Sequence, residues 1–264
     1  MNLEKKYSVA AFIDILGYKE LILKESIERE TELFADLKET IDFALQCTSE
    51  SIKSSMDFLD NKFESSERLA KKLNVKQFSD NIYFSFDYST NDKIDLYFGI
   101  YIITTISCLY QRLMLGKGYF VRGGIANGLN MVDKNFIFST ALIKAVETEK
   151  ETIYPRITLH KELRDIYVEA KDNPFRELTS GQLVEDWAEQ VFLNPFLNYE
   201  QRTQKELDLL PQEIVQGLFQ NISKKQRRLI NKINNKFADY FDDKKFHSLA
   251  RKKIAERIKK HKNK

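Results

Sequence analysis

The chain has 264 residues, of which 42% are hydrophobic and 31% are charged, and its formal net charge is +3. This composition is typical of a folded globular protein and excludes general disorder, while 9 glycines and 4 prolines are too few for a collagen-like or linker-rich chain. The two cysteines cannot form a disulfide framework or a cysteine zinc site, and no long uncharged apolar run predicts a membrane span, so a cytoplasmic protein is expected.

The first predicted element is a buried strand at Tyr7–Ile15 (YSVAAFIDI), which places Asp14 at its carboxyl end. Apolar residues then recur at helical spacing from Lys19 to about Leu73, which predicts one or two long helices with a polar break near Ser49–Ser55. Two short β-prone runs, Val75–Phe78 and Ile82–Phe86, flank a Ser-Asp-Asn turn. This pattern predicts a hairpin with Asp80 at its tip.

Further along the chain, Ile94–Leu115 is predicted to be a helix, and it is more apolar than one sheet face requires, which favours a homodimer. Five of the nine glycines lie between Gly116 and Gly128, around a predicted strand at Tyr119–Ala126. A helix at Ser139–Glu149 and a strand at Pro155–Leu159 follow. The order β-α-β-β-α-β-α-β predicts an α/β (α+β) fold of the ferredoxin-like or palm type, with an antiparallel sheet and flanking helices.

From about Leu183 the pattern predicts helix to the end of the chain. Residues Ile222–Lys264 contain 16 basic and 4 acidic residues, a local charge of +12 against −9 for the rest of the chain. The basic helix predicted here would bind nucleic acid weakly, contact the acidic body or present a solvated face. These three alternatives stay open at the level of sequence.

Asp14 and Asp80 are the candidate chemical residues. The end of the first strand and the tip of the following hairpin lie side by side in a palm sheet, and two carboxylates there would hold divalent cations against a triphosphate. The alternative is that Asp14 caps a helix and Asp80 merely favours a turn.

Three segments resemble motifs of the class III nucleotidyl cyclases. Phe12–Tyr18 (FIDILGY) is similar to F-x-D-I-x-G-F, and Lys76–Asp80 (KQFSD) is similar to K-x-x-G-D with serine in place of glycine. Arg122–Gly128 (RGGIANG) resembles R-x-G-I-x-x-G. The resemblance covers about residues 7–160, and as a free-standing domain the chain looks like the stand-alone bacterial pyrimidine cyclases of Pycsar anti-phage systems.

The resemblance implies that a cyclase-like palm domain occupies residues 1–165 and a helical extension residues 166–264. It further implies that Asp14 and Asp80 are the catalytic carboxylates and that they hold two Mg²⁺ or Mn²⁺ ions together with the Ile15 carbonyl. The backbone amides of Leu16, Gly17 and Tyr18 would cradle the phosphates.

Two basic residues have two open interpretations each. Lys76 either reads the base or is a solvated lysine at a strand edge, and Arg122 either contacts phosphate or pairs with an acidic neighbour. Phe136 and Phe138 likewise either narrow a base pocket or belong to the core.

The sequence departs from the family where the ribose asparagine and the transition-state arginine are expected, because Ile143 and Glu147 occupy those positions. Lys19, Lys144 and Arg156 are the candidates for the missing positive charge.

The leading hypothesis is a metal-dependent cyclase that converts a nucleoside triphosphate, UTP or CTP among them, into a 3′,5′-cyclic mononucleotide and pyrophosphate for a separate effector. The alternatives are a palm-type nucleotidyltransferase that makes a cyclic or linear oligonucleotide, and an inactive nucleotide- or nucleic-acid-binding protein of the same fold.

Overall fold

The computed structural model describes residues 6–19, 27–58, 71–133, 136–152, 154–169, 173, 179, 182–186, 189–195 and 252–253. Within these residues the strands are β1 (Lys6–Ile15), β2 (Leu73–Phe78), β3 (Asn81–Tyr88), β4 (Val121–Val132), β5 (Ile137–Ser139), β6 (Ile157–Leu159), β7 (Leu183–Glu185) and β8 (Val191–Leu193). The helices are α2 (Ile27–Phe58), α4 (Lys93–Gly116), α5 (Thr140–Glu151) and α6 (Lys161–Glu169).

The strands form one eight-stranded sheet in the order β2-β3-β1-β4-β6-β8-β7, with β5 paired to β4. The segment from β1 to β4 has the element order β-α-β-β-α-β and the strand order β2-β3-β1-β4, all antiparallel, which is the ferredoxin-like arrangement. The predicted α+β fold with flanking helices is therefore confirmed. The sheet is mixed rather than wholly antiparallel, because β6 pairs parallel to β4.

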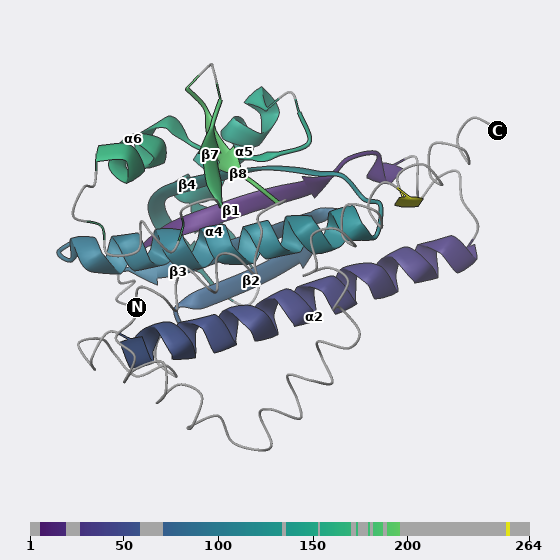
Figure 1. Ribbon diagram of the computed structural model, residues 1–264, viewed down its shortest axis with the longest axis horizontal. Coiled ribbons are helices and arrows are strands. Elements are labelled where there is room, and N and C mark those ends of the chain that lie inside the picture. The colour runs from purple at the N-terminus through teal and green to yellow at the C-terminus, as the bar shows by residue number, and fades with distance from the viewer. Residues whose placement is uncertain are drawn as a thin grey trace.

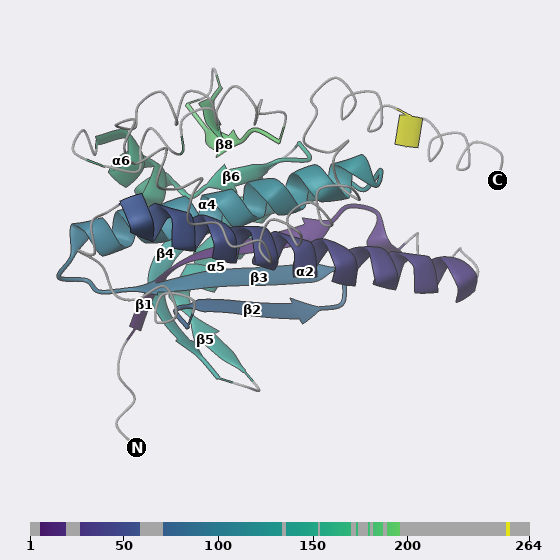
Figure 2. The ribbon, with the colours of Figure 1, turned by 60° about the horizontal axis from the view of Figure 1, so that its bottom comes forward.

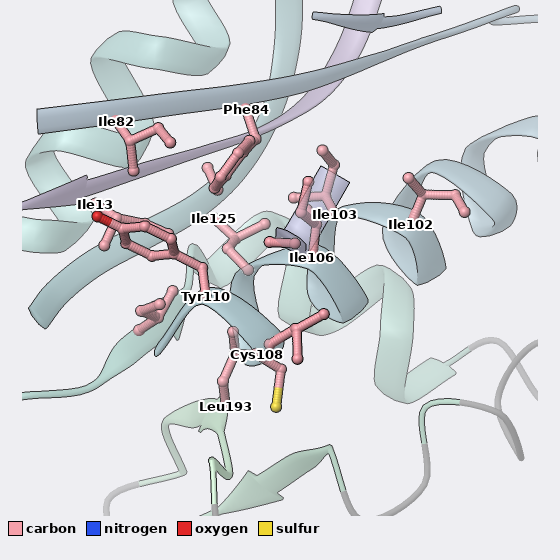
Figure 3. Packing of buried hydrophobic residues seen from close by; sticks show 14 of the residues in the cluster. Ile13, Ile82, Phe84, Ile102, Ile103, Ile106, Cys108, Tyr110, Ile125 and Leu193 are labelled. Atoms are coloured by element: carbon pink, nitrogen blue, oxygen red, sulfur yellow. The ribbon is translucent and has the colours of Figure 1, made fainter. Parts of the chain in front are cut away.

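The main hydrophobic core lies on the face of the sheet that α4 covers, with α2 packed beside α4 (Figures 1 and 2). Alternate residues of β1, among them Val9, Ala11 and Ile13, point into this core because side chains of a strand alternate between the two faces. Figure 3 shows Tyr110 reaching from α4 towards Ile13.

Helix α5 packs on the opposite face, over β4 and β1. Gly124 makes this contact feasible, because a Cβ atom built there would lie 2.2 Å from the carbonyl oxygen of Ala145 in α5. The absent side chain lets the helix rest directly on the strand. Asp14 and Arg122 share this face of the sheet, since β1 and β4 pair Asp14 with Arg122.

Two secondary-structure predictions are wrong. Helix α2 runs without interruption through Ser49–Ser55, so the polar residues there do not break it. The helix predicted from Leu183 is replaced at its start by β7 and β8, which extend the sheet through pairing of β8 with β6. The predicted domain boundary at residue 165 falls inside α6, and most of the predicted extension, including the basic segment after Ile222, lies outside the described residues.

The helix α4 is long and apolar enough to cross a membrane by length and composition, but 94% of its apolar window is buried inside the protein. It contacts β1, β3 and β4 on one side and α2 and β8 elsewhere. These contacts within the chain account for the apolar residues of α4, from which the sequence predicted a homodimer.

Three large apolar side chains are exposed near the hairpin of β4 and β5, which projects from the sheet in Figure 2. Phe136, Phe138 and Ile143 are 62%, 57% and 58% exposed. The interpretation of the two phenylalanines as core residues is therefore wrong, because β5 pairs only with the projecting end of β4.

Candidate metal and nucleotide site

The register of the sheet brings Asp14 and Asp80 together, although they are far apart in sequence. Asp14 pairs with Asn81, the first residue of β3, and Asp80 lies in the turn immediately before it. The Asp80 carboxyl lies close enough to Asp14 to raise its pKa, both through its charge and as a hydrogen-bond partner. The side-chain amide of Asn81 donates a hydrogen bond to Asp80 Oδ1 at 3.0 Å and thereby orients the Asp80 carboxyl group.

The contact between these two acids changes how Asp14 ionises. Partial burial, followed by the charges of Asp80 and Glu149, raises the pKa of Asp14 from its ordinary 3.8 to about 6. A hydrogen bond that the protonated Asp14 carboxyl donates to Asp80 adds to this effect, while the charge of Arg122 opposes it. The ionised pair therefore repels itself, and a bound cation would relieve that repulsion.

The oxygen donors at this place fit a divalent ion of the Mg²⁺ or Mn²⁺ class. Ile15, the last residue of β1, follows Asp14 at this end of the sheet and pairs with Val121 of β4. Within the described part of the chain no group of three or more His, Cys, Asp or Glu side chains could hold a metal ion. Two carboxylates suffice for Mg²⁺, which is usually held by one or two of them together with water and substrate phosphates.

The predicted phosphate cradle after β1 is only partly available. The Leu16 amide donates to the Phe120 carbonyl at 3.0 Å, so it extends the sheet and cannot also bind a phosphate; that part of the prediction is wrong. Gly17 has a φ of +76°, which requires glycine, and the space where a side chain would stand is empty. The open loop therefore consists of Gly17 and the helical residues Tyr18 and Lys19.

Arg122 pairs with an acidic neighbour, which is one of the two interpretations that the sequence left open. Its guanidinium forms a salt bridge with Glu149 of α5 and donates from Nη1 to the Thr152 carbonyl at 3.4 Å. Glu149 is only 5% exposed and was not recognised from the sequence. Since Arg122 faces Asp14 across the β1–β4 pair, the ion pair borders the two acids.

The remaining basic candidates are distributed differently. Lys76 pairs with Tyr83 in the sheet and shares the face of Asp14, whereas Lys19 lies exposed in the loop after β1. Lys144 forms a salt bridge with Glu162. Arg156 bonds to Asp186 at 2.7 Å and stacks 4.6 Å from the Phe192 ring centroid. Lys144 thus contacts α6, whereas Arg156 contacts the β7–β8 turn and β8.

The turn that carries Asp80 is strained. Ser79 adopts a φ of 59°, a conformation that favours glycine, and it stands where the resembled motif has glycine. The exposed serine therefore sits beside Asp80 at some energetic cost.

No protein-family model and no curated protein matches this sequence. Among solved structures, the chain is similar to the adenylyl cyclase CyaB from P. aeruginosa. That likeness has 14% sequence identity and a TM-score of 0.40, and it covers 72% of this chain and 92% of the cyclase chain.

Proposed function

We propose that this chain is a metal-dependent nucleotidyl cyclase that converts a nucleoside triphosphate, UTP or CTP, into a 3′,5′-cyclic mononucleotide and pyrophosphate. The observation that carries the proposal is the placement of Asp14 and Asp80 side by side at one end of the sheet, where burial and the charge of Asp80 raise the pKa of Asp14. Perturbed acids from separate elements gathered at one place are typical of functional sites.

In this proposal Asp14, Asp80 and the Ile15 carbonyl hold two divalent ions, which would neutralise the triphosphate and lower the pKa of the ribose 3′-hydroxyl. The amides of Gly17 and Tyr18 and the side chain of Lys19 bind phosphate oxygens. The ribose 3′-oxygen forms a bond to the α-phosphorus while the bond to the β-phosphate oxygen breaks and the hydroxyl proton leaves to solvent.

Arg122 and Lys76 complete the substrate contacts of the proposed site. The Arg122 guanidinium keeps donor capacity beyond its bonds to Glu149 and Thr152, and it adds positive charge next to the phosphates. Lys76 reads the base from the same face of the sheet as Asp14. Both assignments rest on placement in the sheet and on the motif resemblance.

The direct test incubates the protein with each of the four nucleoside triphosphates and Mn²⁺ and determines the masses of the products. We expect a cyclic mononucleotide from the wild type and none from Asp14→Asn, Asp80→Asn or the double variant. Glu169→Gln, which removes an exposed carboxylate on α6, is the matched control and should retain turnover. An active Asp14→Asn variant would refute the proposal.

A second candidate is a palm-type nucleotidyltransferase that joins nucleotides into an oligonucleotide. It is favoured by the presence of Ile143 and Glu147 on α5, because neither side chain can orient a ribose or stabilise a phosphorane. The same mass measurement separates the two, since a product of two or more nucleotides indicates the transferase. Mn²⁺-independent nucleotide binding without any product would instead indicate an inactive binding protein.

We further propose that the enzyme is a cytoplasmic homodimer and that its product acts on a separate effector in defence against phage. The exposed Phe136, Phe138 and Ile143 supply an apolar surface for the second copy. Light scattering of Phe136→Ser/Phe138→Ser should give a monomer whose circular dichroism shows an intact fold. An unchanged oligomeric state would reject this surface as the interface.

A further inference from the structure

An ion pair beside the proposed site involves an acid that no motif includes. Glu149, in the last turn of α5, forms its salt bridge with Arg122, and the two residues are 27 positions apart in the chain. The Glu149 side chain is 7% exposed and that of Arg122 is 28% exposed. The carboxylate is therefore buried, while the guanidinium lies between the helix and the open end of the sheet.

The packing of α5 on β4 sets the position of this pair. Gly124 follows Arg122 by two residues on the same face of β4, and it allows the close contact with Ala145. Ala145 lies one helical turn before Glu149, so the contact that seats α5 on β4 also fixes where the Glu149 carboxylate lies. The Thr152 carbonyl, at the end of α5, accepts a second bond from Arg122.

Arg122 has a competing partner on its other side. It faces Asp14 across the β1–β4 pair, and the charges of both Arg122 and Glu149 act on the Asp14 carboxyl. A guanidinium forms strong bidentate pairs with carboxylates. Without Glu149, Arg122 would turn to Asp14 and Asp80 and occupy the space where a divalent ion binds.

We propose that Glu149 is a positioning residue that holds Arg122 on the α5 side and so keeps the Asp14 and Asp80 carboxylates open to a divalent ion. This inference rests on the proposed function, because it assumes that the two aspartates bind the ion. Glu149 itself does not touch the ion or the substrate; it acts through Arg122.

The test measures Mn²⁺ binding to the full chain by calorimetry, without nucleotide. Glu149→Gln should bind Mn²⁺ about 10- to 100-fold more weakly than the wild type, the usual effect of losing a group that orients a metal site. In Glu149→Gln/Arg122→Gln no cation competes for the aspartates, so Mn²⁺ affinity should return to near the wild-type value. Asp14→Asn, which removes a proposed ligand, should abolish binding.

These variants separate the possible failures. A wild-type protein that does not bind Mn²⁺, or an Asp14→Asn variant that binds it normally, would overturn the proposed site and this inference with it. If Asp14→Asn loses binding but Glu149→Gln keeps wild-type affinity, only the role of Glu149 is refuted.

The double variant covers the case in which Glu149→Gln fails to fold. It leaves no unpaired charge, so its folding is less demanding, and thermal unfolding verifies that it folds. If the folded double variant binds Mn²⁺ as weakly as Asp14→Asn, Glu149 is not acting through Arg122 and the proposal is wrong.

Discussion

Replacing Asp14 with asparagine should stabilise the protein without metal at alkaline pH and leave its stability unchanged at acidic pH. The pKa of Asp14 is raised to about 6 in the folded protein, against an ordinary value of 3.8. Between these two values the folded protein binds more protons than the unfolded chain. The free energy of unfolding therefore falls as the pH rises through this window, and the full loss persists above pH 6.

The size of the effect follows from the shift. A change of about two pKa units corresponds to at most about 3 kcal/mol. Asp14 is only half-buried, so water screens the repulsion and about 1 kcal/mol is a sounder expectation. For a chain of this length, that is a rise in melting temperature of about 2–4 °C in Asp14→Asn at pH 8.

The assay is thermal unfolding in EDTA at pH 4 and pH 8, with Glu169→Gln as a control for loss of an exposed negative charge on α6. The control should show no pH-dependent difference from the wild type. The reasoning is refuted if Asp14→Asn is less stable than the wild type at pH 8, or if its advantage is the same at both pH values.

Three further predictions concern the frame around the site. Ser79→Gly should raise stability by about 0.5–1 kcal/mol in urea unfolding because glycine adopts the positive φ without strain; a loss of stability would show that the turn favours serine. Gly124→Ala should lower stability by about 2 kcal/mol or more, since its Cβ would stand 2.2 Å from the Ala145 carbonyl oxygen, and an unchanged melting temperature would contradict the close contact. Asn130→Ala should cost about 3 kcal/mol, because the buried Asn130 amide accepts from the Tyr83 hydroxyl at 2.8 Å and donates to two serine hydroxyls; a loss below about 1 kcal/mol would mean that water replaces the amide.

Much of the site's frame was predictable because its signals are local. The alternation in Tyr7–Ile15 identifies a strand that ends at Asp14, and two β-prone runs around a short polar turn identify the hairpin that carries Asp80. In an antiparallel palm these two positions lie at the same end of the sheet, and the register of β1 with β3 places them in contact.

Other features depended on contacts between distant segments, which local periodicity does not encode. Leu183–Leu193 has no strong strand pattern, and β7 and β8 form because β6 offers backbone hydrogen bonds to β8. The residues of the loop after β1 do not reveal a partner for the Leu16 amide, yet the Phe120 carbonyl accepts its hydrogen bond. The local sequence around Phe136 and Phe138 does not distinguish an exposed side chain from a core side chain. The projecting hairpin of β4 and β5 leaves both of them in solvent.

The ferredoxin-like order of elements and the two aspartates could therefore be predicted from sequence, because strand alternation and turn chemistry act over a few residues. Which charge stands beside the aspartates depends on how distant elements pack. In the sequence, Glu149 is indistinguishable from other acidic residues at the end of a helix. Gly124 allows α5 to pack closely on β4, and this packing directs the Glu149 carboxylate to Arg122. The rotation and depth of a helix on a sheet are set by side chains from both elements together, so no local pattern in either one reveals the pair.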